Sequence, residues 1–193
     1  MKQPLMALNA RFDVNQVDDG IDWLFSDIEL VGSDRSLTDP HWNRDINFSV
    51  GQEFRIAISA SDQDKTGFES FEVIDCCMIT RPRILCCGPN VRTWYAPPSL
   101  FVDDNGAQLG ALYQVAPSAF SVHSTGVDPT KGRKVTLLWD GHLTVGPYNG
   151  FWDISFYVTV SIKRIGEEQT QLRVFYFDPE GEVGNGTYPP KSK

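Results

Sequence analysis

The chain has 193 residues, which fits one domain, and its 25 acidic and 17 basic residues give a net charge of -8. A surface of this sign repels phosphate backbones and anionic lipid, so neither nucleic acid nor a membrane is an expected partner. Residues 1–14 lack the apolar core of a secretory signal, and no run reaches the ~20 apolar residues of a membrane helix, so we expect a cytoplasmic protein.

Alternating apolar and polar residues predict β-strands along most of the chain, because successive strand side chains point to opposite faces. The predicted strands are residues 7–14, 25–31, 53–60, 71–79, 110–115, 135–139, 151–163 and 171–178. The clearest pattern is FWDISFYVTVSIK at 151–163, where every second residue from Trp152 to Ile162 is apolar. A short helix over residues 19–30 is an alternative near the N-terminus.

Gly, Asn and Asp separate the strands, as in Asp103-Asp104-Asn105-Gly106 and Gly166-Glu167-Glu168. At least eight short strands with such turns predict an all-β fold, an antiparallel β-sandwich of jelly-roll-like or Ig-like type. Residues 88–134 contain several prolines and glycines, and we expect long loops around a hairpin in this middle part. Residues 1–179 are predicted to form a single domain and residues 180–193 a flexible C-terminal tail.

All four cysteines lie in one stretch, DCCMITRPRILCCGPN, as the pairs Cys76-Cys77 and Cys86-Cys87. Neighbours on a strand face apart, so the four thiols do not converge as a zinc site requires. We therefore expect two strands joined by an exposed turn at residues 80–83, with one thiol of each pair packed inward. A disulfide between Cys77 and Cys86 is the alternative.

One polar segment resembles the start of a calcium loop. Asp62-Gln63-Asp64-Lys65-Thr66-Gly67 has the acidic spacing, but the twelfth position, where an EF-hand needs a bidentate Glu, is Val73. A plain polar loop is the favoured interpretation, and we expect no metal. The sequence leaves open a non-standard calcium site made of Asp62, Asp64 and Glu69.

The sequence contains no motif that indicates catalysis. It lacks a Gly-x-Ser-x-Gly elbow, a phosphate-binding loop and a dinucleotide fingerprint. His41, His123 and His142 lie in turn-rich contexts, and a hydrolase with a dispersed site around one of them is an alternative. We expect no enzyme, no catalytic residues and no cofactor.

Aromatic residues in predicted loops are the candidate binding residues. Trp94 and Tyr95 precede two prolines, and Trp42 follows Asp-Pro-His. Exposed Trp and Tyr side chains can stack on a sugar or anchor a protein partner. The alternative is that these three residues cap the ends of the core.

Two regions resemble the bacterial inclusion-body protein family (PixA/AidA-like). The first is residues 45–79, with a turn at Val50-Gly51-Gln52 where the family has Val-Gly-Asp; the second is residues 151–179, which close in Phe177-Asp178-Pro179 where the family has Trp before Asp-Pro. The resemblance implies a cytoplasmic protein that accumulates by self-association and has no catalytic residues to carry over. We therefore expect a non-enzymatic homo-oligomer that self-assembles or binds a partner, with a carbohydrate-binding, lectin-like module as the alternative.

Overall fold

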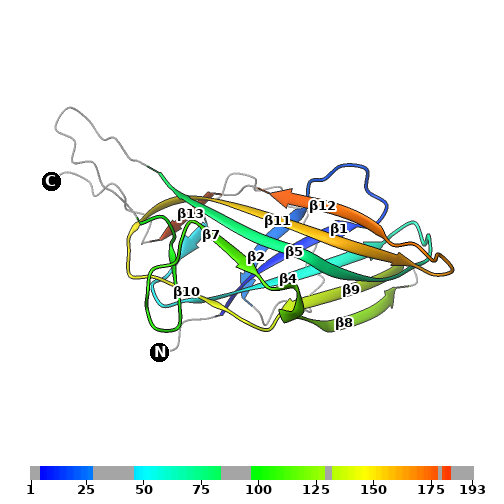
Figure 1. Ribbon diagram of the computed structural model, residues 1–193, viewed down its shortest axis with the longest axis horizontal. Coiled ribbons are helices and arrows are strands. Elements are labelled where there is room, and N and C mark those ends of the chain that lie inside the picture. The colour runs from blue at the N-terminus through cyan, green and yellow to red at the C-terminus, as the bar shows by residue number, and fades with distance from the viewer. Residues whose placement is uncertain (1–4, 28–45, 84–96, 129–131, 178–179, 184–193) are drawn as a thin grey trace.

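The computed structural model describes residues 5–27, 46–83, 97–128, 132–177 and 180–183. In these ranges the chain forms two β-sheets packed face to face, which confirms the predicted all-β sandwich (Figure 1). The single helical segment of the described ranges is one 3-10 turn, η2 (Pro117–Ala119). The sandwich is therefore built almost entirely from strand pairing.

The first sheet is organised around β4, a strand of ten residues. Parallel β1 lies on one side of β4, while β10 and then β9 pair with it antiparallel on the other. At the margins β2 pairs with β1, β8 with β9, and β6 with β10. The strands of this sheet are β1 (Met6–Asp13), β2 (Asp22–Asp27), β4 (Glu53–Asp62), β6 (Phe101–Val102), β8 (Phe120–Asp128), β9 (Gly132–Trp139) and β10 (Leu143–Val145).

The second sheet is organised around β11, which pairs antiparallel with β5 along nearly its whole length. On its other side β11 pairs first with β13 and then with β12, while β7 lies outside β5 and β3 lies parallel to β13. In Figure 1 this sheet faces the viewer and the first sheet lies behind it. Its strands are β3 (Ile46–Phe48), β5 (Phe68–Pro82), β7 (Leu112–Val115), β11 (Gly150–Arg164), β12 (Gln171–Phe177) and β13 (Glu180–Val183).

The core fills the space between the sheets with the inward residues that the alternation predicted. All of the alternate apolar residues of β11 from Trp152 to Ile162 are buried, as are Phe54, Ile56, Ile58 and Ala60 of β4. The indole N–H of Trp152 donates to the carbonyl of Pro97 at 2.9 Å, so the buried ring keeps a hydrogen-bond partner. Burial of each large apolar side chain contributes about 1.5–3 kcal/mol, which makes this layer the main source of stability.

One alternative and one prediction near the strand ends are wrong. The alternative helix over residues 19–30 is not formed at residues 22–27, which form β2, because pairing with β1 places Trp23 opposite Ala10 and satisfies the backbone in a sheet. The predicted strand at 25–31 is confirmed for residues 25–27, and its other residues lie outside the described ranges. The predicted exposed turn at residues 80–83 is also wrong, because Thr80, Arg81 and Pro82 belong to β5. Thr80 is only 2% exposed and lies opposite Ile154, because β11 is long enough to keep β5 in the sheet as far as Pro82.

The middle of the chain contains more strands than its Pro and Gly content predicted. β6, β7 and β8 all lie within residues 88–134, and β8 was missed because both of its faces are largely exposed and show no alternation. The predicted turn at residues 103–106 is confirmed, with Gly106 at φ +78°.

The pairing directions and the C-terminal boundary also differ from the prediction. The sheets are not wholly antiparallel, since β1 with β4 and β3 with β13 are parallel pairs. β13 begins where the flexible tail was expected, because the first residues of β11 extend past β12 and take β13 as a partner.

Replacing Phe156 with Ala should lower the free energy of unfolding by about 3–5 kcal/mol, because the ring is fully buried and its loss leaves a cavity. Thr159→Ala on the same strand is the control and should cost less than about 1 kcal/mol, because that side chain is only half-buried on the outer face. Urea unfolding followed by tryptophan fluorescence measures both. Equal losses for the two variants would contradict the assignment of faces.

Candidate interaction surface

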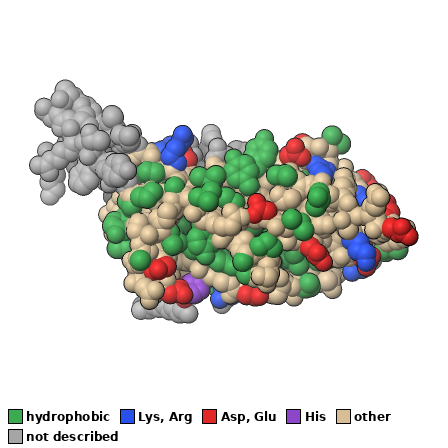
Figure 2. Space-filling view, viewed as in Figure 1, with side chains coloured by type: hydrophobic (Ala, Val, Ile, Leu, Met, Phe, Trp, Pro, Cys, Tyr) green, Lys and Arg blue, Asp and Glu red, His purple; other side chains and the backbone are tan. Residues whose placement is uncertain are grey.

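The outer face of the second sheet carries apolar side chains where a water-exposed sheet usually carries polar ones. Leu112 is 60% exposed, Val174 51% and Tyr176 50%, and each projects from a strand whose alternate residues point into the core. We call this surface the apolar face; it consists of Leu112 on β7, Ile74, Cys77 and Ile79 on β5, Tyr157 on β11, and Leu172, Val174 and Tyr176 on β12. Figure 2 shows this side of the molecule, with apolar side chains spread over its middle.

Strand register makes the apolar face continuous across four strands. Tyr157 lies opposite Tyr176 on one side and opposite Cys77 on the other, and the two tyrosine rings stack with centroids 6.0 Å apart. Two residues after Cys77, on the same face of β5, Ile79 lies opposite Leu112 of β7. A bulge in β5 adds Ile74, because Val73 and Asp75 both pair with β11 while the residue between them has no counterpart.

Ion pairs border the apolar face at both ends of the long strands. At one end Arg81 and Arg83 both donate to Asp153, with 2.6 Å between Arg83 Nε and Asp153 Oδ1. Burial raises the pKa of the Asp153 carboxyl, and the two guanidinium groups more than reverse this, so its pKa lies below the usual value. At the other end Lys163 Nζ lies 3.0 Å from Glu69. This arrangement, an apolar centre with a polar border, is the usual anatomy of a protein–protein contact.

The outer face of the first sheet differs from the apolar face across its middle. Its outward row alternates polar and small apolar residues, with Ala7, Asn9 and Arg11 on β1 and Arg55, Ala57 and Ser59 on β4, and Ala7, Asn9 and Ala57 are buried. Ser59 shares a hydrogen bond of 2.8 Å with Thr136 of β9, which is also buried. The exposed apolar residues of this sheet, Leu24 on β2 and Val122 and Val127 on β8, lie on its outer strands and form no row across its middle. The apolar face is therefore the candidate functional site of the described structure.

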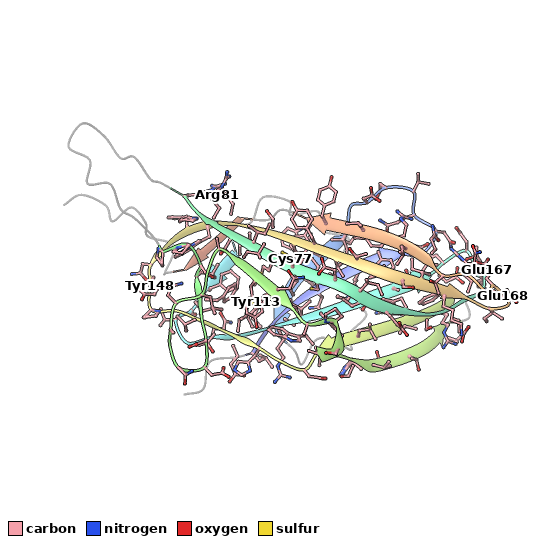
Figure 3. The ribbon with its side chains drawn as sticks, viewed as in Figure 1. Cys77, Arg81, Tyr113, Tyr148, Glu167 and Glu168 are labelled. Carbon is pink, nitrogen blue, oxygen red and sulfur yellow. The ribbon has the colours of Figure 1, made fainter. Side chains whose placement is uncertain are left out.

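The first cysteine pair behaves as the strand pattern predicted. Cys76 is buried in the core, where burial raises the pKa of its thiol well above the ordinary value, and Cys77 points to the apolar face. Figure 3 shows Cys77 midway along β5. Cys86 and Cys87 lie outside the described residues, but Cys77 is a free thiol, so the alternative disulfide between Cys77 and Cys86 is not formed in this structure.

The buried Asp62 side chain stabilises the turn between β4 and β5. Its carboxylate is buried and accepts hydrogen bonds from the amides of Thr66, Gly67 and Phe68, from the Thr66 hydroxyl and from the side-chain amide of Asn15. Burial raises the pKa of Asp62, but these hydrogen bonds outweigh it and lower the pKa to about 2. The residue singled out as a calcium ligand is thus already saturated with donors.

The other two acidic residues of the calcium hypothesis do not join Asp62. Asp64 is exposed, and Glu69 pairs with Lys163 on the outer face. Among the described residues no three His, Cys, Asp or Glu side chains converge as metal ligands would. The polar loop favoured by the sequence is therefore a structural turn.

The remaining sequence candidates are scattered. His142 Nε2 lies 3.5 Å from Asp104 in a loop, His123 is exposed on β8, and His41 lies outside the described residues. Trp42, Trp94 and Tyr95 also lie outside them. The hydrolase and carbohydrate-binding alternatives accordingly stay predictions.

A scan against protein-family models, a search of curated proteins and a search of solved structures each found no match to this chain. The resemblance to the inclusion-body family accordingly stays an expectation carried by the quoted residues. No helix within the described ranges has the length and apolar character needed to cross a lipid bilayer.

Sequence reasoning missed the apolar face although one signal was present. In QLRVFYF the residues Leu172, Val174 and Tyr176 share one face and Phe175 and Phe177 the other, so β12 is apolar on both sides. A strand at the edge of a sandwich has one face in water, and two apolar faces indicate that the outer one is a contact surface.

Replacing Asp62 with Asn should lower the free energy of unfolding by about 2 kcal/mol at pH 7, because the carboxylate that holds five donors is lost. The pKa of Asp62 is lower in the folded protein than in the unfolded chain, so the parent protein loses this stabilisation as the pH falls from about 4 towards 2. The free energies of unfolding of the parent and the Asp62→Asn variant therefore converge at low pH. Urea unfolding at pH 7 and pH 2.5 measures both values. The control Asp64→Asn changes an exposed acidic residue of the same turn and should leave stability unchanged. An Asp62→Asn variant as stable as the parent at pH 7 would show that the Asp62 carboxylate does not stabilise this turn.

Proposed function

We propose that this protein is a non-enzymatic, cytoplasmic β-sandwich that self-associates through the apolar face. The observation that carries the proposal is the set of exposed apolar side chains that extends across four strands of the second sheet. Self-association is also what the resemblance to inclusion-body proteins implies.

The charges around the apolar face allow a second copy as its occupant, because most of its acidic groups are paired and Glu72 is the exposed exception on β5. Each chain carries a net charge of -8, so two copies repel each other over most orientations. Contact through the apolar face brings together Leu, Ile, Val and Tyr side chains, and at the borders the acidic groups Asp153 and Glu69 are already paired with cations. Asp75 is held by the side-chain amide of Gln114 within the sheet.

The stacked pair Tyr157–Tyr176 is the expected centre of the contact. Tyrosine combines a large apolar ring with a hydroxyl group and is among the residues most often found at the energetic centre of interfaces. The pair joins β11 to β12, so the rings are held by the sheet before contact is made and lose little freedom on association.

Replacing Val174 with Lys should raise the dissociation constant of self-association about tenfold or more, because a charged group at a desolvated contact costs at least 1.4 kcal/mol. The added positive charge reduces the overall repulsion between chains, so weaker association cannot be a net-charge effect. Sedimentation velocity over a concentration series measures the constant.

Ile165→Lys is the matched control, since Ile165 is 68% exposed in the β11–β12 turn and is not part of the apolar face. Glu167 and Glu168 of the same turn lie at the far end of the molecule from Arg81 (Figure 3). The Ile165→Lys variant should associate like the parent protein. A parent chain that stays monomeric at the highest concentration reached, or a Val174→Lys variant indistinguishable from Ile165→Lys, would overturn the proposal.

A further inference from the structure

One side of the sandwich is built from a stretch of chain that carries no formal charge. Between Asp104 and Asp128 the sequence contains no Asp, Glu, Lys or Arg, in a chain that is 22% charged. This stretch supplies one outer strand to each sheet: β7 to the second sheet and β8 to the first. Charged side chains are the common means by which sheet edges are kept from pairing with other chains, and this side lacks them.

Two other described edges are blocked. The outer edge of β12 is covered, because Tyr176 exchanges backbone hydrogen bonds with Asp19 and Ile21. Arg173 holds the same segment by donating to backbone carbonyls of Gln16 and Asp18.

The first half of β5 is blocked in a different way. That edge carries Glu69, Glu72 and Asp75, and the bulge at Ile74 interrupts its regular pairing. A strand added there would meet acidic side chains in succession.

β8 has none of these features along most of its length. It pairs with β9 on one side, and no other described strand pairs with it. Val122 is 64% exposed and Val127 73%, so both ends of the strand offer apolar side chains to a neighbour. A bulge at His123 increases the local twist, but it leaves the five residues from Ser124 onward in regular register.

We infer that β8 pairs antiparallel with β8 of a second copy, so that two first sheets join into one continuous sheet across a two-fold axis. Full overlap of the two strands places Ser124 opposite its counterpart and Asp128 opposite Phe120. In this alignment of the two β8 strands no two like charges face each other, as expected for a strand that pairs with its own copy. β9 satisfies the backbone groups of alternate residues of β8, and the second copy satisfies those of the intervening residues, which point the other way.

This inference rests on the proposed function and deepens it. The apolar face and the β8 edge belong to different sheets, so each copy can use both contacts at once. Each contact alone is two-fold and closes a dimer, whereas two different two-fold contacts on one chain link copies into an open-ended assembly. The chemistry of the partner is therefore a second copy of this chain at both surfaces.

The test uses charges at Ser124, where the two strands cross. In Ser124→Lys or Ser124→Glu alone, like charges meet across the axis and should raise the dissociation constant of the β8 contact about fivefold or more. An equimolar mixture of the two variants places Lys opposite Glu and should restore the assembly size of the parent protein. Sedimentation velocity measures assembly size, and circular dichroism establishes that each variant is folded.

Ser118→Lys, in the same uncharged stretch but on η2 outside β8, is the matched control and should assemble like the parent. Either Ser124 variant assembling like the control, or a mixture that stays at the size of the single variants, would overturn the β8 pairing while the proposed function stands. Loss of assembly in Val174→Lys together with unchanged assembly in both Ser124 variants identifies the apolar face as the working contact. A monomeric parent chain overturns both.

Discussion

The long antiparallel ladder between β5 and β11 is the constraint on which the rest of the structure depends. The two strands are 15 residues each and stay paired from Trp152 opposite Pro82 to Arg164 opposite Phe68. One set of their alternate residues supplies the centre of the core, and the other set supplies the middle of the apolar face. A slip of one residue would exchange the two faces, so core and candidate contact surface are specified by the same register.

Features at both ends of the ladder hold this register. Asp62 organises the turn that leads into β5, and its buried carboxylate collects donors from both the turn and the segment after β1. At the far end Arg81 and Arg83 fasten β5 to Asp153 on β11. Asp62 lies away from the candidate contact surface and the Asp153 ion pairs lie at its border, so together they fix where that surface begins and ends.

The sequence predicted the strands that have one face buried in the core and the other exposed to solvent. Trp152 to Ile162 on β11 and Phe54 to Ala60 on β4 alternate clearly, and their inward residues are buried as expected. β8 could not be found this way, because residues 121–127 are exposed on both faces and carry no apolar period. The apolar face was also missed, since Tyr157 and Tyr176 become neighbours only through pairing of β11 with β12, which no local pattern encodes.

The apolar face is assembled from segments as far apart in the chain as Ile74, Leu112 and Tyr176, and it exists only once the second sheet has formed. An unfolded chain has no such surface and cannot take part in the same contact. The proposed association through this surface would therefore act as a ligand of the native state and raise the apparent stability by mass action. In such an assembly, a higher local concentration would protect each copy against unfolding and proteolysis.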